Sequence, residues 1–346
     1  LEFRRVLFRS ILNEGILQIG TGVELQTGSE EIVVGSDGRL IVQDGGMVTL
    51  QRFALVGGGT CYLDDGGQLA ASELEILDGG TFFLNTSLTV PEVRISSGGI
   101  LTHSSGDPDF ALNVTGDMLV EVGGSVEANG KGYSADSGPG RGSAYSLQDN
   151  AGAGGGGYGG AGGSAWAAGG NVYGSINVPD DLGSGGGHCD GVWGRRAHGG
   201  AGGGVLYVAV NGLLTLNGTI STNGLAGHRG SYSSWRWAGG GGSGGSIHLD
   251  VGTLTGAGVI SADGGNGGYT DLAGGGGGGR IALYSDSDMF SGSLRAVGGD
   301  GREDGGAGTI YRKSSSQPYG ELLLDNGGRS GAHTHLLGGT YEFSEV

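Results

Sequence analysis

The sequence has few of the residues that a disulfide-stapled, collagen-like or nucleic-acid-binding protein requires. It contains two cysteines and five prolines among 346 residues, and 18 Lys and Arg against 35 Asp and Glu. Two cysteines cannot build a disulfide framework, and a chain with little proline and no strict Gly-X-Y period is not collagen-like. We expect Cys61 and Cys189 to be buried thiols, with one bridge between them as the alternative in an oxidising compartment. The net charge of −17 disfavours nucleic acid and anionic lipid surfaces as partners.

Long apolar runs and catalytic motifs are also missing. No stretch approaches the roughly 20 apolar residues that span a bilayer, so we expect no membrane insertion. The sequence has no Gly-x-Ser-x-Gly elbow between a strand and a helix, no phosphate loop and no dinucleotide fingerprint in a fitting context. We therefore expect a chain that is not an enzyme and needs no cofactor.

The two ends of the chain differ from what lies between them. Residues 1–10 (LEFRRVLFRS) resemble the translated read-through of a sequencing-library adapter, and such segments are left out of fold reasoning. They carry Glu2 against Arg4, Arg5 and Arg9, a net of +2, so the remaining chain carries −19 rather than −17. The last residues, GGTYEFSEV, read as the start of a further strand. We expect an internal piece of a longer secreted chain, whose signal peptide is not in this sequence.

Glycine is the dominant residue, with 86 of 346 positions against a usual share of about 7%. Within residues 11–130, Gly-Gly pairs begin at positions 45, 66, 79, 98 and 123, with gaps of 21, 13, 19 and 25 residues. Short stretches that alternate apolar and polar residues lie between the pairs, and this alternation indicates half-buried strands. Glycine adopts positive φ at corners without a steric penalty. The spacing predicts a short-coil parallel β-solenoid stalk over residues 11–130.

A longer repeat follows, in which glycine runs such as GGGGSGG and GGGGGG separate the strands. Its strand segments begin at Phe110, Val205, Ser246 and Arg280, and a truncated copy begins at Thr309. A lone glycine run indicates a flexible linker, but runs that recur once per repeat favour packed polyglycine II helices. We thus expect an all-β chain, a parallel β-solenoid (β-helix) whose glycine-rich runs pack as polyglycine II helices between longer coils. The glycine-rich region with aromatic loops covers residues 131–308, and the last, truncated coils cover residues 309–346.

These repeats resemble those of a known class of proteins. Strings such as GGGGSGGSIHLDVGTLTGAGVISADGG and GGGGGGRIALYSDSDMFSGSLRAVGGDG are similar to glycine-rich repeats of large surface and secreted, adhesin-like proteins of environmental bacteria. The resemblance covers about residues 110–339. A looser likeness, of architecture alone, is to phage tail-fibre adhesins, in which polyglycine helices form a bundle and the loops between them bind the host. The resemblance implies an extracellular or cell-surface location and a binding role.

The loops between the glycine runs hold all four tryptophans of the sequence, together with tyrosine and arginine. Such residues on loops held by a rigid scaffold are typical of a recognition surface, and aromatic rings stack on the apolar faces of sugars. The alternative is that these rings only cover the glycine-rich surface and one another. We predict binding of a glycan or another cell-surface component through Trp166, Tyr173, Trp193, Arg195, Arg196, Tyr232, Trp235, Arg236 and Trp237.

Other functions remain open at this point. One is a purely structural spacer of a giant surface protein, and another is a β-helix polysaccharide lyase or hydrolase, which requires paired carboxylates. The carboxylates available for that chemistry are Asp64, Asp65 and Glu75, or Asp180 and Asp181. His188, Cys189, Asp190 and His198 form a weak zinc pattern, and residues 298–306 (GGDGREDGG) faintly resemble calcium-binding turns. We predict no metal site, with incidental Ca²⁺ binding by the turn carboxylates as the alternative.

Overall fold

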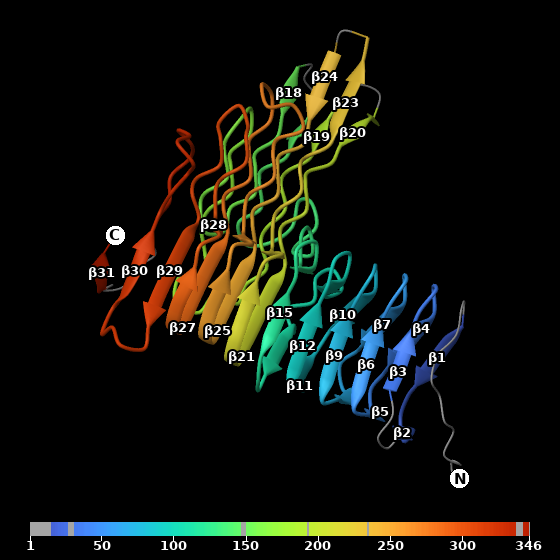
Figure 1. Cartoon of the computed structure of the whole chain (residues 1–346). Coiled ribbons are helices and arrows are strands. Elements are labelled where there is room, and N and C mark those ends of the chain that lie inside the picture. Colours follow the sequence, from blue (N-terminus) through green and yellow to red (C-terminus); the bar gives the residue numbers. More distant parts are fainter. Residues whose placement is uncertain are drawn as a thin grey trace.

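The described part of the protein is built from strands and loops, with no α-helix. The computed structural model describes residues 15–26, 31–146, 150–191, 194–233, 235–336 and 342–345, so the adapter-like residues 1–10 lie outside the described residues. The elements of this part are all strands, which confirms the all-β prediction, and most strand pairs are parallel (Figure 1). Within the same ranges, no helix has the length and apolar character that a membrane span requires.

The strands form two long sheets and three short ones. The nine-stranded sheet holds β1 (Ile16–Ile19), β4 (Arg39–Val42), β7 (Thr60–Leu63), β10 (Thr81–Leu84), β13 (Ile100–Thr102), β16 (Ser125–Glu127), β22 (Thr219–Ser221), β26 (Val259–Ser261) and β28 (Ser293–Arg295). The thirteen-stranded sheet holds β3 (Glu31–Val34), β6 (Arg52–Leu55), β9 (Glu73–Ile76), β12 (Glu92–Ile95), β15 (Met118–Val120), β21 (Val205–Leu216), β25 (Ser246–Gly256), β27 (Arg280–Phe290), β29 (Thr309–Ser314), β30 (Gly320–Leu323) and β31 (Phe343–Glu345), joined by β11 (Ser87–Val90) and β14 (Ala111–Val114). The short sheets are β2 (Glu24–Gln26), β5 (Met47–Thr49) and β8 (Gln68–Ala70); β17 (Tyr145–Ser146), β19 (Cys189–Asp190) and β20 (Arg196–Ala197); and β18 (Ala151–Gly152), β24 (Trp235–Ala238) and β23 (Arg229–Tyr232).

From β1 to β28 and from β3 to β29, neighbouring strands in the two long sheets come from successive circuits of the chain, whereas β30 follows β29 directly and pairs with it antiparallel. In the nine-stranded sheet Thr60 pairs with Arg39 on one side and with Thr81 on the other, an offset of 21 residues in each direction. Further on, Thr219 pairs with Ser125 and with Val259. The offset there is larger because long loops are inserted between the strands.

The core lies between the long sheets and is built from rows of side chains, one from each circuit. One inward row runs across the nine-stranded sheet through Leu40, Cys61, Phe82, Leu101 and Val126, each 0% exposed. Each fully buried apolar side chain in such a row contributes about 1.5–3 kcal/mol. Cys61 belongs to this row, and both cysteines are buried free thiols, as expected.

The paired glycines serve two different purposes at the corners of the circuits. Gly66 has a φ of +75°, which matches the predicted need for positive φ. Its neighbour Gly67 has no such need, but a Cβ there would lie 2.5 Å from the carbonyl oxygen of Val42 in the preceding circuit. The first glycine therefore permits the turn, and the second permits the circuits to stack closely.

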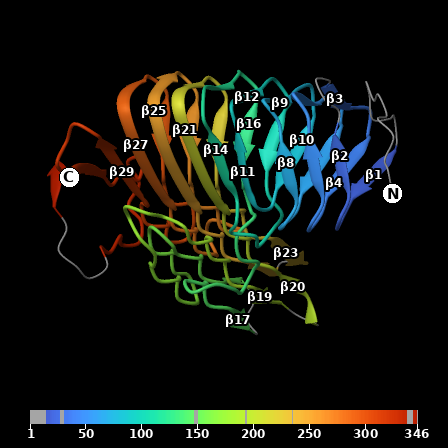
Figure 2. The same ribbon diagram turned by 90° about the horizontal axis from the view of Figure 1, so that it is seen from below.

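Glycine-rich loops leave the stack at one corner, after four successive strands of the nine-stranded sheet. We call residues 128–204, 222–245, 262–279 and 296–308 the first, second, third and fourth glycine loops; each returns to the thirteen-stranded sheet. Figures 1 and 2 show that they gather on one side of the stacked strands, with the short strands β17, β19, β20, β23 and β24 at their outer ends.

The loops are tied to one another by backbone hydrogen bonds that repeat every third residue. In the run 274–279 of the third loop, Gly274 and Gly277 donate to Ala153 and Gly156, Gly275 and Gly278 donate to Glu303 and Gly306, and Gly276 and Gly279 donate to Gly265 and Ala262. The run 239–245 follows the same rule with its own three neighbours. Among the described residues, no glycine of these two runs has positive φ. Glycine is needed there for close approach: a Cβ on Gly276 would lie 2.0 Å from the carbonyl oxygen of Gly242.

Candidate functional site

Aromatic and arginine side chains from all four glycine loops meet at the outer ends of the loops. The first loop contributes through β17, β19 and β20, the second through the β23–β24 hairpin, and the third and fourth through their turns. We call this set the distal surface and define it as Tyr145, Trp166, Arg195, Arg196, Arg229, Tyr232, Trp235, Arg236, Tyr269, Asp271 and Arg302.

Trp166 and Tyr232 are the most exposed rings of this surface, at 47% and 42% of their full exposure. The guanidinium carbon of Arg302 lies 5.1 Å from the centre of the Trp166 ring, and that of Arg195 lies 5.1 Å from the centre of the Tyr232 ring. A cation over an aromatic face contributes about 0.5–1 kcal/mol at an exposed site. These contacts fix the orientation of both rings and leave much of their surface open to solvent.

Tyr269 joins the second and third loops. Two arginines of the hairpin contact its ring: the ring centre lies 5.3 Å from the guanidinium carbon of Arg229 and 5.0 Å from that of Arg236. Arg236 also forms an ion pair with Asp271, and its hydrogen bond lowers the pKa of that carboxyl. The distal surface therefore holds charges of both signs beside its aromatic rings.

Trp237 lies beneath this surface and cannot touch a ligand there. Its side chain is 2% exposed and packs in a small core with Ala151 and Cys189. Two glycines leave room for the indole: a Cβ on Gly191 would lie 2.3 Å from the ring, and one on Gly230 would lie 2.1 Å from Nε1. Trp237 was expected to contact a ligand, but its place is that of an anchor that holds the hairpin against the first loop.

Tyr173 also differs from the expectation, because it lies near the base of the loops. Its hydroxyl donates to the carbonyl of Leu182 and lies 2.7 Å from the Oγ of Ser184, and its own carbonyl accepts from Arg280 of β27. Burial raises the pKa of the Tyr173 hydroxyl well above its usual range. Tyr173 therefore ties the first loop to the thirteen-stranded sheet.

Of the remaining predicted residues, the structure describes Trp235 and Arg196 but not Trp193. Trp235 is half-buried and pairs with Tyr232 across the hairpin, and Arg196 forms an ion pair with Asp190 at 2.7 Å. The hydrogen bond from Arg196 lowers the pKa of Asp190. Trp193 lies outside the described residues.

The weak zinc pattern does not converge on one point. His188 and Asp190 lie on one side of β19, where His188 Nδ1 is 2.7 Å from a carboxylate oxygen of Asp136. Cys189 points to the other side, because successive residues of a strand alternate. Its Sγ lies 3.5 Å from the carbonyl oxygen of Ala151, and burial raises its pKa to about 11. Among the described residues no group of three or more His, Cys, Asp or Glu side chains is placed to hold a metal ion.

Sequence reasoning missed Arg302, which lies in the segment that resembled a calcium-binding turn. There the carboxylates have protein partners: Asp300 pairs with Arg329 at 3.1 Å, and Glu303 accepts from the backbone N–H of Ser164 at 2.7 Å. The only signal in the sequence was an arginine within a glycine- and aspartate-rich run, and nothing there indicated Trp166 as its partner.

Two of the five carboxylates considered for a lyase, Glu75 and Asp64, have side-chain partners. Glu75 forms ion pairs with Arg52 and Arg94, and Asp64 accepts a hydrogen bond from Asn85 at 3.0 Å. Burial raises the pKa of Asp181, whose backbone carbonyl accepts a hydrogen bond from Ser246.

No protein-family model, no curated protein and no solved structure matches this chain, so its function is inferred from its own residues.

Proposed function

We propose that this chain is a non-catalytic, extracellular or cell-surface repeat protein that binds glycans or other cell-surface components through its distal surface. The observation that carries the proposal is the pair of exposed rings, Trp166 and Tyr232, each held beneath an arginine from the surrounding loops. The proposed framework is a parallel β-solenoid from which the glycine loops project as a bundle of polyglycine II helices.

Two features support the framework. The offset of 21 residues between paired strands, with glycine corners stacked at the same place in each circuit, is what a solenoid of short coils requires. The hydrogen-bond partners of the run 274–279 repeat every third residue, and a polyglycine II helix has three residues per turn and no internal hydrogen bonds. Each turn of such a helix then presents the same three directions to its neighbours.

A rigid bundle favours recognition because the binding loops are ordered before the ligand arrives. Binding by a flexible loop costs about 0.5–1.5 kcal/mol for each side chain that becomes fixed. In the distal surface Trp166, Tyr232 and Tyr269 already have arginine partners, so much of this cost is met during folding.

The chemistry of the distal surface suits a carbohydrate. Aromatic faces stack on the C–H faces of sugar rings, while guanidinium groups donate to sugar hydroxyls and carboxylates accept from them. Arg195 and Arg302 lie beside the exposed rings, and Asp271, which pairs with Arg236, supplies a carboxylate on the same surface. The extracellular location is proposed from the resemblance to surface repeat proteins.

A glycan array tests the proposal. The purified protein is compared with Trp166→Ala/Tyr232→Ala and with the control Tyr319→Ala, whose ring is 44% exposed but lies outside the distal surface. We expect the parent and the control to bind the same glycans and the double variant to lose that binding. If the parent binds no glycan, or if the double variant binds like the parent, the adhesin function is wrong and a purely structural spacer is favoured.

A further inference from the structure

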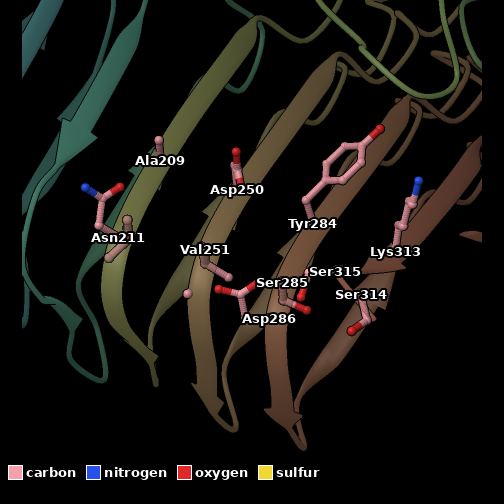
Figure 3. Close-up of a pocket in the computed structure, with 12 residues that line it drawn as sticks. Ala209, Asn211, Asp250, Val251, Tyr284, Ser285, Asp286, Lys313, Ser314 and Ser315 are labelled. Atoms are coloured by element: carbon pink, nitrogen blue, oxygen red, sulfur yellow. The ribbon is translucent and has the colours of Figure 1, made fainter. Parts of the chain in front are cut away.

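A groove lies on the outer face of the thirteen-stranded sheet, away from the distal surface. It has a volume of about 400 Å³ and crosses the four parallel strands β21, β25, β27 and β29. Figure 3 shows side chains from all four strands around it. Small residues, Ala209 and Gly252, form part of its floor, and the larger side chains of Asp250, Tyr284 and Lys313 surround it.

The charged side chains of the groove are those of Asp250, Asp286 and Lys313. Among the described residues no ion pair involves Asp250, Asp286 or Lys313. In the N-terminal part of the same face the charges are paired, since Arg52 and Arg94 form ion pairs with glutamates of neighbouring circuits. The three charged groups of the groove therefore stay available to a ligand, whereas Arg52 and Arg94 are already paired.

Aromatic rings form a ladder along the upper side of the groove, one from each strand. The ring centres are 5.0 Å apart between Tyr207 and His248, 5.4 Å apart between His248 and Tyr284, and 5.7 Å apart between Tyr284 and Tyr311. This spacing follows the distance of about 4.8 Å between adjacent strands. It is close to the length of one pyranose unit in an extended glycan.

The first glycine loop closes one end of this ladder. Ile176 packs against Tyr311, which is 5% exposed, and the hydroxyl of Tyr284 donates to the carbonyl of Asn177 at 2.9 Å. These contacts hold the Tyr284 ring upright at the edge of the groove. Tyr207 and His248 remain half-buried, so the other end of the ladder is open.

We propose that this groove binds an extended, neutral polysaccharide chain that crosses the strands, with successive sugar units beside successive strands. The carboxylates of Asp250 and Asp286 accept hydrogen bonds from sugar hydroxyls, and the ammonium group of Lys313 donates one. The partly exposed rings of the ladder, Tyr207, His248 and Tyr284, meet the apolar faces of the sugars. Two carboxylates against one ammonium group disfavour a polyuronate. This second site is independent of the distal surface and does not rest on the function proposed for it.

Isothermal titration calorimetry with defined hexasaccharides tests the second site. The probes are the β-1,4-linked hexamers of glucose, N-acetylglucosamine, mannose and xylose, with hexagalacturonate as the acidic comparison. We expect at least one neutral hexamer to bind the parent protein and hexagalacturonate to bind more weakly. In Asp250→Ala/Asp286→Ala the affinity should fall at least about tenfold, because hydrogen bonds to charged groups are lost.

Two controls separate this site from the distal surface and from a general effect of charge. Asp65→Ala removes an exposed carboxylate on a distant turn, and Trp166→Ala/Tyr232→Ala alters only the distal surface; both should retain the affinity of the parent. No tryptophan lines the groove, so binding there should leave the tryptophan fluorescence unchanged. The proposal is overturned if no neutral hexamer binds, if hexagalacturonate binds more tightly, or if Asp250→Ala/Asp286→Ala binds like the parent.

Discussion

Substituting one glycine of the bundle tests whether close approach is the reason for the glycine runs. In Gly276→Ala the new Cβ would lie 2.0 Å from the carbonyl oxygen of Gly242 and 2.5 Å from its carbonyl carbon. Real Cβ contacts essentially never fall below 3.0 Å, so one buried backbone must move by at least 1.0 Å. Such overpacking typically costs about 1–3 kcal/mol, and each backbone hydrogen bond lost adds about 1 kcal/mol. We expect Gly276→Ala to lower the free energy of unfolding by about 2–5 kcal/mol.

The assay is urea unfolding followed by circular dichroism, with a matched control in the same chain. Gly20 has ordinary φ and nothing within 4 Å of the position of a Cβ, so Gly20→Ala should be neutral or stabilise by up to about 1 kcal/mol. If Gly276→Ala is no more destabilising than Gly20→Ala, the close-approach explanation is refuted.

Three further predictions concern buried side chains. Burial raises the thiol pKa of Cys61 and Cys189, so Ellman's reagent should label neither in the native protein and both in urea; rapid labelling of the native protein would contradict this placement. Burial lowers the pKa of the His103 imidazole below its ordinary value of 6.5, so the unfolded chain binds a proton at this side chain more readily than the folded chain does. The free energy of unfolding should therefore fall as the pH drops below about 6.5, by up to about 1.4 kcal/mol per pH unit. In urea unfolding between pH 7 and pH 5, His103→Gln should lose less stability than the parent, and an equal loss would argue against this cause. Trp237→Ala should cost about 3–5 kcal/mol, whereas Trp166→Ala should cost only about 1 kcal/mol, mainly for the lost contact with Arg302. Similar losses in thermal unfolding would show that the two rings are not buried and exposed as described.

The features that sequence predicted best are local ones. Alternation within three or four residues identifies strands such as β7 and β10, and a glycine pair such as Gly66 and Gly67 marks the corner beside them. The buried row through Cys61 and Phe82 follows once these corners are stacked. Each of these features depends on neighbouring residues along the chain, so the sequence carries a direct signal for them.

The candidate sites depend on contacts between distant segments, and these were predicted only in part. Trp166 and Arg302 come from different loops, and no periodicity in the sequence indicates that they meet. Trp237 was grouped with the exposed rings because composition does not distinguish an anchor from a contact residue. The aromatic ladder had a readable signal, since Tyr207 and His248 occupy the same place in two aligned repeats and pair in register. The contact by which Ile176 of the first loop covers Tyr311 is not encoded in the repeats.

The central claim is that the glycine runs form an ordered, hydrogen-bonded bundle that holds the distal surface rigid. Hydrogen–deuterium exchange followed by mass spectrometry tests it most directly, by comparing residues 239–245 and 274–279 with strand β25. We expect amides in both runs to exchange as slowly as those of β25, because each donates to a neighbouring run or loop. Complete exchange of the runs within seconds, while β25 stays protected, would show that they are flexible linkers and would contradict the account.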